Sequence, residues 1–434
     1  MTDDKTATGS LARGGRILVL AAAFFGWMFA GIEMSLMISA TRPAIQEFLS
    51  ATQNVALQAP QTTETLEVSA DSWFSAYLVA FFLGAALGGA VFGTIGDRFG
   101  RVKGMGFSIL CFSIVTGLSY FVTGPEQLLV LRFVACMGIG GMWPTGVALV
   151  SESWPNVSRP MLAGLIGAAA NVGFLILGLL MLVMPVTKES WRWVLLLGAC
   201  PVVLGVLVLA FVPESPRWLS RGRGQEDATR SSPLREVFRP PLLRLTIVGI
   251  FLGAIPLLGG WASGQRLVPW AGKVGQSENL LHLKALTQTI WSLGAVLGSL
   301  AGGWIASRMG RRSSYFAVSA LSLTVSLFVF LYSQPTAGSF LPLVFSLGLV
   351  ATVYFGWLPY FLPELFPTSV RATGAGVSFN FGRILSAVAV LSTAFLSEVF
   401  RGDIAKMGAA TSLVYVFGML IVIFIPRSSQ FEEP

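Results

Sequence analysis

The chain alternates between long apolar runs and short polar gaps. Each run holds about 19 to 26 residues, which is enough for a helix to cross a hydrocarbon core roughly 30 Å thick. Because lipid offers no hydrogen-bond partners, the backbone N–H groups of each run must be satisfied internally, and helices are expected. The pattern therefore predicts an all-α integral membrane protein. The runs predict twelve transmembrane helices, at 17–40, 72–94, 104–123, 128–150, 161–186, 191–212, 241–262, 286–306, 313–333, 339–362, 372–398 and 408–426.

Composition supports this interpretation. The 434 residues are 54% hydrophobic and only 12% charged, with a mean hydropathy of +0.73, whereas soluble chains carry about a quarter charged residues. The net charge of +8 could suggest nucleic acid, but the basic residues fall in gaps between apolar runs. We therefore expect the protein to lie in a lipid bilayer and to bind no nucleic acid.

Basic residues also predict the orientation. Most Lys and Arg lie on the cytoplasmic side if the N-terminus is cytoplasmic, as the positive-inside rule requires. We expect a multi-pass protein of the plasma membrane, in a bacterium the inner membrane, with both termini in the cytoplasm. The opening "MTDDKTATGSLARGGR" precedes no A-x-A-like cleavage site, so the first run is interpreted as a retained span.

The usual catalytic and metal-binding patterns are missing from the sequence. Cys111, Cys136 and Cys200 fall inside predicted spans, and His282, the only histidine, lies in an external loop. The "GIGG" at 138–141 sits within a span and follows no strand, so it does not indicate a nucleotide site. We expect that the protein is not an enzyme and that it binds no metal and no cofactor.

A repeat divides the chain. The glycines and charged residues of "GAALGGAVFGTIGDRFGR" return in "GAVLGSLAGGWIASRMGR", so that Gly84 corresponds to Gly294, 210 positions later. Likewise "ESWPNVSR" returns as "ELFPTSVR", which pairs Glu152 with Glu364 at an offset of 212. We predict two six-helix bundles, 1–212 and 241–434, joined by a cytoplasmic linker at 213–240. The glycines at four-residue spacing indicate close helix packing.

The charged loop "GDRFGR" predicts a gate. It places Asp97 and Arg98 at a helix end and Arg101 just beyond, where they could bridge to neighbouring helices, close one face and separate when it opens. A topological anchor is the alternative, but it leaves Asp97 unexplained.

These motifs resemble those of the major facilitator superfamily over essentially the whole chain. "GTIGDRFGR" is similar to its loop 2–3 signature, with Val102 in place of the usual basic residue, and "SRMGRR" to the second copy, with Ser307 in place of the usual acid. "LRFVACMGIGG" resembles the fourth-helix motif, "PESPRWL" the segment after helix six in sugar porters, and "PELFPTSVRATG" the end of helix ten. The resemblance implies alternating access, gated by a cytoplasmic network. Its members would be Gly93, Asp97, Arg98, Arg101, Glu152, Arg159, Glu214, Arg217, Arg308, Arg311, Glu364 and Arg371.

Glu33 is the candidate proton carrier. A charge at mid-bilayer costs about 2.5 to 3.5 kcal/mol on insertion scales, so intramembrane acids are commonly functional. "GIEMS" occupies the place of the helix-one acid of proton-coupled porters, which neighbours a helix-four arginine, here Arg132. A nearby guanidinium favours the ionised carboxylate, and separation favours the protonated one. A static interhelical ion pair is the alternative.

Arg383 is the candidate substrate residue. It lies twelve residues past Arg371, roughly 18 Å deeper along the predicted helix, and a buried guanidinium is suited to bind a carboxylate bidentately. Its spacing resembles that in organic anion transporters, and nearby segments resemble aromatic-acid, sialic-acid and lactate symporters. Asn380 could add a hydrogen bond on the same helical face. Further candidates are Asn171, Trp357 and Tyr360.

The sequence thus favours a monomeric secondary transporter that carries a small organic anion together with protons. One alternative is a multidrug or organic cation exporter, which leaves Arg383 unexplained. A sugar symporter is less favoured, because few polar side chains lie where sugar porters bind their substrate, and a membrane sensor would often carry an added soluble domain. The external stretches 41–71 and 263–285 are longer than topology requires and could form lids, but their composition predicts solvated loops.

Overall fold

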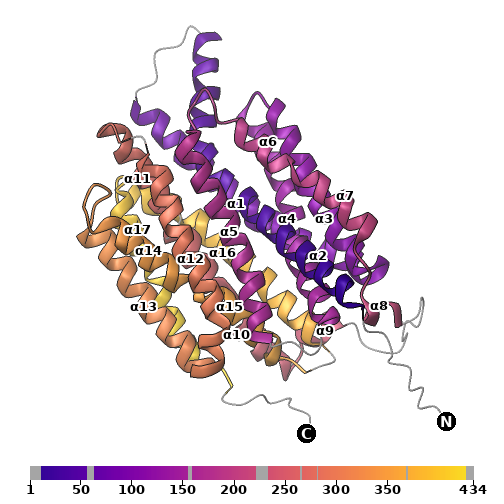
Figure 1. Ribbon diagram of the computed structural model, residues 1–434. Coiled ribbons are helices and arrows are strands. Elements are labelled where there is room, and N and C mark those ends of the chain that lie inside the picture. Colours follow the sequence, from indigo (N-terminus) through magenta and orange to yellow (C-terminus); the bar gives the residue numbers. More distant parts are fainter. Residues whose placement is uncertain are drawn as a thin grey trace, which may run out of the picture.

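The computed structural model describes residues 11–55, 63–154, 159–220, 233–263, 266–280, 282–367 and 370–426. Every regular element in these ranges is a helix, and twelve segments are long and apolar enough to cross a membrane. The predicted number of spans is confirmed. They form two six-helix bundles, one in the indigo and magenta part of the chain and one in the orange and yellow part (Figure 1).

The first bundle contains the spans up to the linker. Its sixth span is broken at Cys200, where the helix is interrupted just before Pro201. The elements are α1 (Arg13–Val55), α2 (Thr63–Phe99), α3 (Arg101–Leu118), η1 (Ser119–Phe121), α4 (Pro125–Ser153), α5 (Arg159–Val183), α6 (Trp193–Ala199) and α7 (Pro201–Phe211). Two short helices, α8 (Pro216–Ser220) and α9 (Pro233–Val237), lie beyond it at the end of the molecule where α1 begins (Figure 1).

The second bundle contains more irregular spans. Its first helix ends in a π-helical turn, and two of its spans are each split into two consecutive helices. The elements are α10 (Leu242–Leu258), η2 (Gly259–Ser263), α11 (Leu267–Ser277), α12 (Leu283–Met309), α13 (Arg311–Tyr332), α14 (Phe340–Ala351), α15 (Val353–Phe361), η4 (Pro363–Leu365), α16 (Arg371–Val399), α17 (Ile404–Ser412), α18 (Val414–Ile421) and η5 (Val422–Phe424).

The repeated glycines make equivalent contacts in both bundles. A Cβ added at Gly88 of α2 would lie 1.9 Å from the carbonyl oxygen of Met137 in α4. Its counterpart Gly298 of α12 would place a Cβ 1.9 Å from the carbonyl oxygen of Leu349 in α14. Only glycine permits such approach, so the interpretation of these glycines as packing residues is confirmed at both positions.

Two pairs of helices make the most extensive contacts between the bundles. α5 packs against α12, and α2 packs against α16. In Figure 1, α5 and α12 lie side by side where magenta meets orange. Of the candidate residues on these helices, Asn171 of α5 contacts α12, and Arg383 and Asn380 of α16 contact α2.

The expectation of solvated external loops is wrong for residues 41–50 and for the buried face of α11, whereas residues 278–280 and His282, which follow α11, are exposed as expected. α1 continues to Val55 and α2 begins at Thr63, while Ile45 and Phe48 are buried and the Phe48 ring packs edge-on against Trp191 at 5.8 Å. In the second stretch, α11 buries its apolar face, including Leu267. Polar residues on the opposite helix faces lowered the average hydropathy and hid these amphipathic extensions.

Candidate functional site

Glu33 and Arg132 form a buried ion pair inside the first bundle. Glu33 lies on α1 and Arg132 on α4, and their side chains are 0% and 3% exposed. Glu33 Oε1 accepts hydrogen bonds from the Arg132 guanidinium and from the Thr116 hydroxyl, the latter at 2.5 Å. Arg132 also donates to the Thr116 oxygen at 2.7 Å. The three side chains form a closed triangle between α1, α3 and α4.

The second carboxylate oxygen of Glu33 is the irregular feature of this triangle. Oε2 is buried and has no hydrogen-bond partner within the described part of the chain. It faces Gly198 of α6, where an added Cβ would lie 2.6 Å from it. Any side chain at position 198 would therefore press on the carboxylate.

A small pocket lies against the other side of Arg132. Met37, Tyr77 and Trp191 are among its lining residues, and Trp191 lies in the segment just before α6. The pocket thus lies between Arg132 of the ion pair and Trp191 of the segment between α5 and α6.

Arg383 lies between the bundles and has neutral partners. Its side chain is buried, and Nη1 donates to the carbonyl oxygen of Ala85 on α2 at 3.1 Å and to Asn380 Oδ1 at 3.4 Å. The guanidinium carbon lies 4.8 Å from the centre of the Phe379 ring. Among the described residues, the fully buried charged side chains are Glu33, Arg132 and Arg383. With Glu33 paired to Arg132, the interior carries an excess positive charge at Arg383.

Asn380 also contacts the facing bundle. Its side-chain amide lies against Gly89 of α2, where a Cβ would come within 2.8 Å of the amide oxygen and nitrogen. Arg383 and Asn380 thus share one face of α16 and both contact α2.

The remaining substrate candidates lie elsewhere. Asn171 of α5 donates to Ser299 Oγ of α12 at 2.8 Å, so it joins the bundles on the opposite side. Trp357 is buried in the second bundle, where its indole N–H donates to Ser314 Oγ at 3.0 Å, and Tyr360 packs against Phe361 at 4.5 Å. The described contacts therefore do not place Asn171, Trp357 or Tyr360 around Arg383. Trp357 is 1% exposed and its indole N–H is bonded to Ser314, so its cavity-lining role stays a prediction that these contacts do not support.

The predicted gate forms a network in the first bundle. Arg101 pairs with Asp97 and has its Nε 3.4 Å from Glu152 Oε1. Glu214, in the segment before α8, accepts from the backbone N–H of Val102 at 3.2 Å, and Ser215 donates to Glu152. These contacts tie α2, α3, α4 and α8 together at one end of the bundle.

The other network candidates are more dispersed. In the second bundle Arg311 pairs with Glu364 at 2.6 Å, while the Arg308 guanidinium lies 4.9 Å from the Trp304 ring centre. Arg98 is exposed, and a Cβ at Gly93 would have no atom within 4 Å. The side chains of Arg159, Arg217 and Arg371 lie outside the described residues.

The sequence analysis missed a contact between the bundles at the opposite end. Lys284 of α12 donates to the carbonyl oxygen of Ser39 on α1 at 2.7 Å. Pro43, four residues after Ser39, has no N–H to bond this carbonyl within the helix. A proline inside the α1 pattern was the available signal, since it leaves a carbonyl for a partner from another helix.

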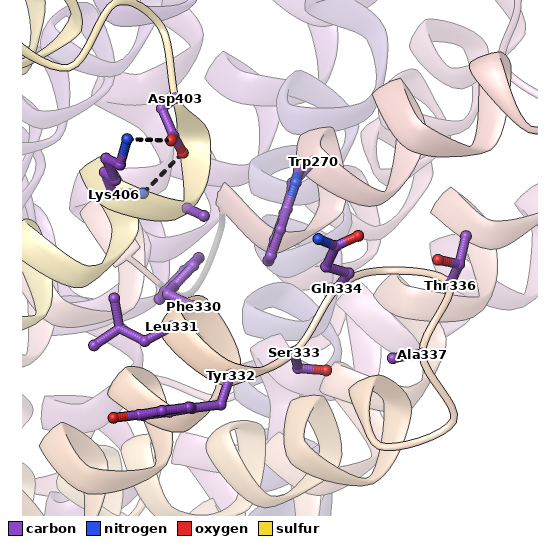
Figure 2. Close-up of a pocket in the computed structure, with 11 residues that line it drawn as sticks. Trp270, Phe330, Leu331, Tyr332, Ser333, Gln334, Thr336, Ala337, Asp403 and Lys406 are labelled. Carbon is purple, nitrogen blue, oxygen red and sulfur yellow. Dashed lines mark hydrogen bonds and ion pairs between the residues drawn. The ribbon is translucent and has the colours of Figure 1, made fainter.

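A second pocket lies at an end of the second bundle, between α11, α13 and α17 (Figure 2). Trp270, Gln334, Asp403 and Lys406 are among its lining residues, and Asp403 caps α17 by accepting from the Lys406 backbone N–H at 3.1 Å. Partial burial would raise the pKa of Asp403, but hydrogen bonds from Lys406 outweigh it and hold the pKa below its usual value. No predicted site residue lines this pocket.

Comparison with known proteins agrees with this architecture. The family model described as Major Facilitator Superfamily matches residues 17–390. The chain is 29% identical to the cis,cis-muconate transport protein of Acinetobacter baylyi over 80% of this chain and 84% of that protein. It is 30% identical to the putative niacin/nicotinamide transporter NiaP of Bacillus subtilis over 70% and 74% of the two chains. A partially occluded inward-open structure of the xylose transporter XylE from E. coli shares the fold, with a TM-score of 0.67 at 18% identity and coverage of 96% and 99%. The chain therefore belongs to the major facilitator superfamily.

Proposed function

We propose that the protein is a secondary transporter that carries a small organic anion across the membrane together with protons, by alternating access. The two bundles, 1–212 and 241–434, would rock about a central site and move relative to the linker at 213–240. Both termini would lie in the cytoplasm, and in a bacterium the protein would lie in the inner membrane. A single chain contains every residue that this mechanism uses, so a monomer would suffice.

Arg383 is the observation that carries the proposal for an anion. Its guanidinium is buried, its described partners are a carbonyl, an amide and an aromatic ring, and the only fully buried acid among the described residues pairs elsewhere. A carboxylate substrate would supply the missing charge and can accept two parallel N–H bonds from a guanidinium. Two relatives are named for muconate and for niacin, which are carboxylates at neutral pH, although the second name also gives nicotinamide, which is uncharged.

Glu33 and Arg132 are proposed to couple the proton. Closed, the ion pair favours the ionised carboxylate; when Glu33 takes up a proton, Arg132 still has the Thr116 oxygen at 2.7 Å as a hydrogen-bond acceptor. The triangle therefore offers Arg132 a partner in either state of Glu33. This contact lowers the cost of switching between the two states, because a buried guanidinium without an acceptor is costly.

Helix α2 is the physical link between the two sites. Tyr77 lines the small pocket beside Arg132, and Ala85, eight residues further along α2, accepts from Arg383. Eight helical residues span roughly 12 Å. A shift of α2 on anion binding at Arg383 would therefore act directly beside the ion pair.

The organic cation exporter remains the rival function. Such a protein would use Glu33 as its binding charge, yet Glu33 is fully buried within one bundle and already paired with Arg132. The rival also leaves Arg383 without a function. The structure therefore favours the anion over the cation.

Substitution of Arg383 tests the proposal. Arg383→Ala removes a buried charge partner, for which truncation costs about 2–5 kcal/mol, equivalent to roughly 30-fold to several thousand-fold weaker binding. Arg383→Lys keeps the charge and loses the planar fork, so we expect intermediate affinity. Calorimetry with carboxylates and the purified full chain gives the affinities, and Arg239→Ala, which removes an exposed arginine, is the control. Unchanged carboxylate affinity in Arg383→Ala would overturn the anion proposal.

A further inference from the structure

Five aromatic rings from both bundles pack together. They are Phe81 and Phe82 of α2, Phe174 of α5, Trp261 of η2 and Trp291 of α12, and we call them the aromatic cluster. Trp261 lies at its centre, with ring-centre distances of 4.7 Å to Phe81, 6.1 Å to Phe82 and 6.3 Å to Phe174. Phe174 lies 6.0 Å from Trp291. All five are buried.

The aromatic cluster and Arg383 are adjacent along α2. Ala85, whose carbonyl accepts from Arg383, comes four residues after Phe81 and three after Phe82. Residues three and four apart lie on the same face of a helix, one turn or about 5.4 Å apart along its axis. A molecule that bound Arg383 through a carboxylate could therefore place its body against the rings.

Within the described part of the chain, two buried polar atoms, one in the aromatic cluster and one on the same face of α12, lack partners. Trp291 is 5% exposed and Gln288 is 0% exposed, and neither Trp291 Nε1 nor Gln288 Oε1 has a hydrogen-bond partner among the described residues. The Gln288 amide nitrogen donates to Ser292 Oγ at 3.0 Å, which fixes the side chain. Gln288 and Trp291 are three residues apart and share one face of α12. Buried polar atoms are normally paired, so a donor and an acceptor left together indicate a ligand position.

The backbone at Trp261 is irregular. The turn Gly259–Ser263 is π-helical and follows Pro256 within α10, and a Cβ added at Gly260 would meet no atom within 4 Å. π-helical turns are frequent at functional sites, and interrupted helices commonly form the substrate sites of transporters. Trp261 is thus carried by an irregular turn, and there is open space at the neighbouring Gly260.

We propose that the aromatic cluster, with Gln288 and Trp291, binds the planar, conjugated body of a carboxylate whose charged group is held by Arg383. This inference rests on the proposed function and names its substrate class. Flat rings pack against flat conjugated molecules in offset-stacked or edge-to-face geometry, and these five rings carry only two hydrogen-bond donors, the indole N–H groups of Trp261 and Trp291, for a hydroxyl-rich sugar. The Trp291 N–H and the Gln288 oxygen bind a polar substituent on the substrate away from its carboxylate, such as a ring hydroxyl.

Ligand selectivity of the unmodified protein gives the first test. Benzoate and cyclohexanecarboxylate have the same carbon skeleton and charge, but only benzoate is planar. In calorimetry with the full chain in lipid nanodiscs, we expect benzoate to bind at least tenfold more tightly, and 4-hydroxybenzoate more tightly still. Equal affinities for benzoate and cyclohexanecarboxylate would overturn the aromatic-cluster proposal and leave the anion proposal standing. Absence of binding by any carboxylate would overturn both.

Two substitutions test which residues recognise the planar body and the polar substituent of the ligand. Trp261→Leu should reduce the preference for benzoate over cyclohexanecarboxylate by about tenfold, while Arg383→Ala weakens both acids together. Trp291→Phe keeps a ring and removes the N–H, so it should cost about tenfold for 4-hydroxybenzoate and little for benzoate. Trp304→Phe, at a position 58% exposed on the same helix as Trp291, is the matched control. A Trp291→Phe effect equal for both ligands would contradict the assigned hydrogen bond.

Discussion

Gly198 offers a sharp test of the coupling site, because a single methyl group there reaches Glu33. In Gly198→Ala, the added Cβ would lie 2.6 Å from Glu33 Oε2, 2.7 Å from Thr116 Cγ2 and 2.9 Å from Leu36 Cδ2. All three distances are shorter than ordinary contacts between heavy atoms. The substitution therefore pushes the Glu33 carboxylate and the Thr116 side chain, which are two of the three members of the buried triangle.

The magnitude follows from the contacts. Overpacking of this kind costs about 1–3 kcal/mol, and a hydrogen bond to a charged group, such as that from Thr116 to Glu33, contributes about 1.5–3 kcal/mol. Loss of that bond alone corresponds to roughly a tenfold to 150-fold change in an equilibrium. We expect Gly198→Ala to lower proton-driven uptake at least tenfold relative to substrate exchange, which does not require a net proton transfer.

A control on the same span separates coupling from crowding. Gly205→Ala would place its Cβ 2.7 Å from Leu110 Cδ2, a comparable clash that involves only aliphatic side chains. Both variants would be reconstituted into liposomes, and uptake driven by a pH gradient would be compared with exchange at equal pH. If both variants lost proton-driven uptake to the same extent, or if Gly198→Ala kept the full ratio, the role of Glu33 in coupling would be refuted.

The remaining predictions concern the two ends of the molecule. Gly100 has φ +118° and a Cβ there would lie 2.2 Å from Glu214 Oε2, whereas Gly310, its counterpart in the repeat, has φ +78° and no atom within 4 Å. Both alanine variants would adopt a positive-φ, extended-ψ conformation that is nearly restricted to glycine, at a cost of about 1–3 kcal/mol. Only Gly100→Ala also displaces Glu214, so its melting temperature in detergent should fall further, and equal falls would contradict the Glu214 contact. At the opposite end, Lys284→Met removes the hydrogen bond to the Ser39 carbonyl. The readout is Ser39→Cys in a background without the native cysteines, because this cysteine becomes accessible to maleimide when α1 separates from α12. We expect about tenfold faster maleimide labelling, since a charged hydrogen bond contributes about 1.5–3 kcal/mol, and an unchanged labelling rate would exclude a closing role for Lys284.

Much of the fold could be predicted because hydrophobic length is decisive in a membrane. The twelve runs correspond to the observed spans, and the repeat pairs Gly88 with Gly298, which make the same close contact in each bundle. The extension of α1 past residue 40 could not be predicted, because its burial depends on α11 and on Trp191, which are distant in the sequence. Average hydropathy identifies segments that are apolar on all sides, as in lipid. It does not detect amphipathic helices that bury one face against each other.

The candidate site divides in a similar way. Charged residues in spans are costly wherever they occur, so Glu33, Arg132 and Arg383 stood out in the sequence, and all three are buried. The neutral residues around them did not stand out, because aromatic residues are common in all spans. Trp357 was selected and Trp261 was not, although the structure places Trp357 in the bundle core and Trp261 at the junction of the bundles.

The central claim is that anion movement and proton movement are one process. Its most direct test is proton entry into liposomes that contain the purified full chain and an internal pH dye, measured as benzoate-type acids, lactate, sialic acid, hexoses and organic cations are added in turn. The account predicts internal acidification that saturates with planar carboxylates, is lost in Arg383→Ala, and is lost in Glu33→Gln while substrate exchange persists. Silence with every acid, together with alkalinisation on addition of cations, would contradict it and identify an exporter instead.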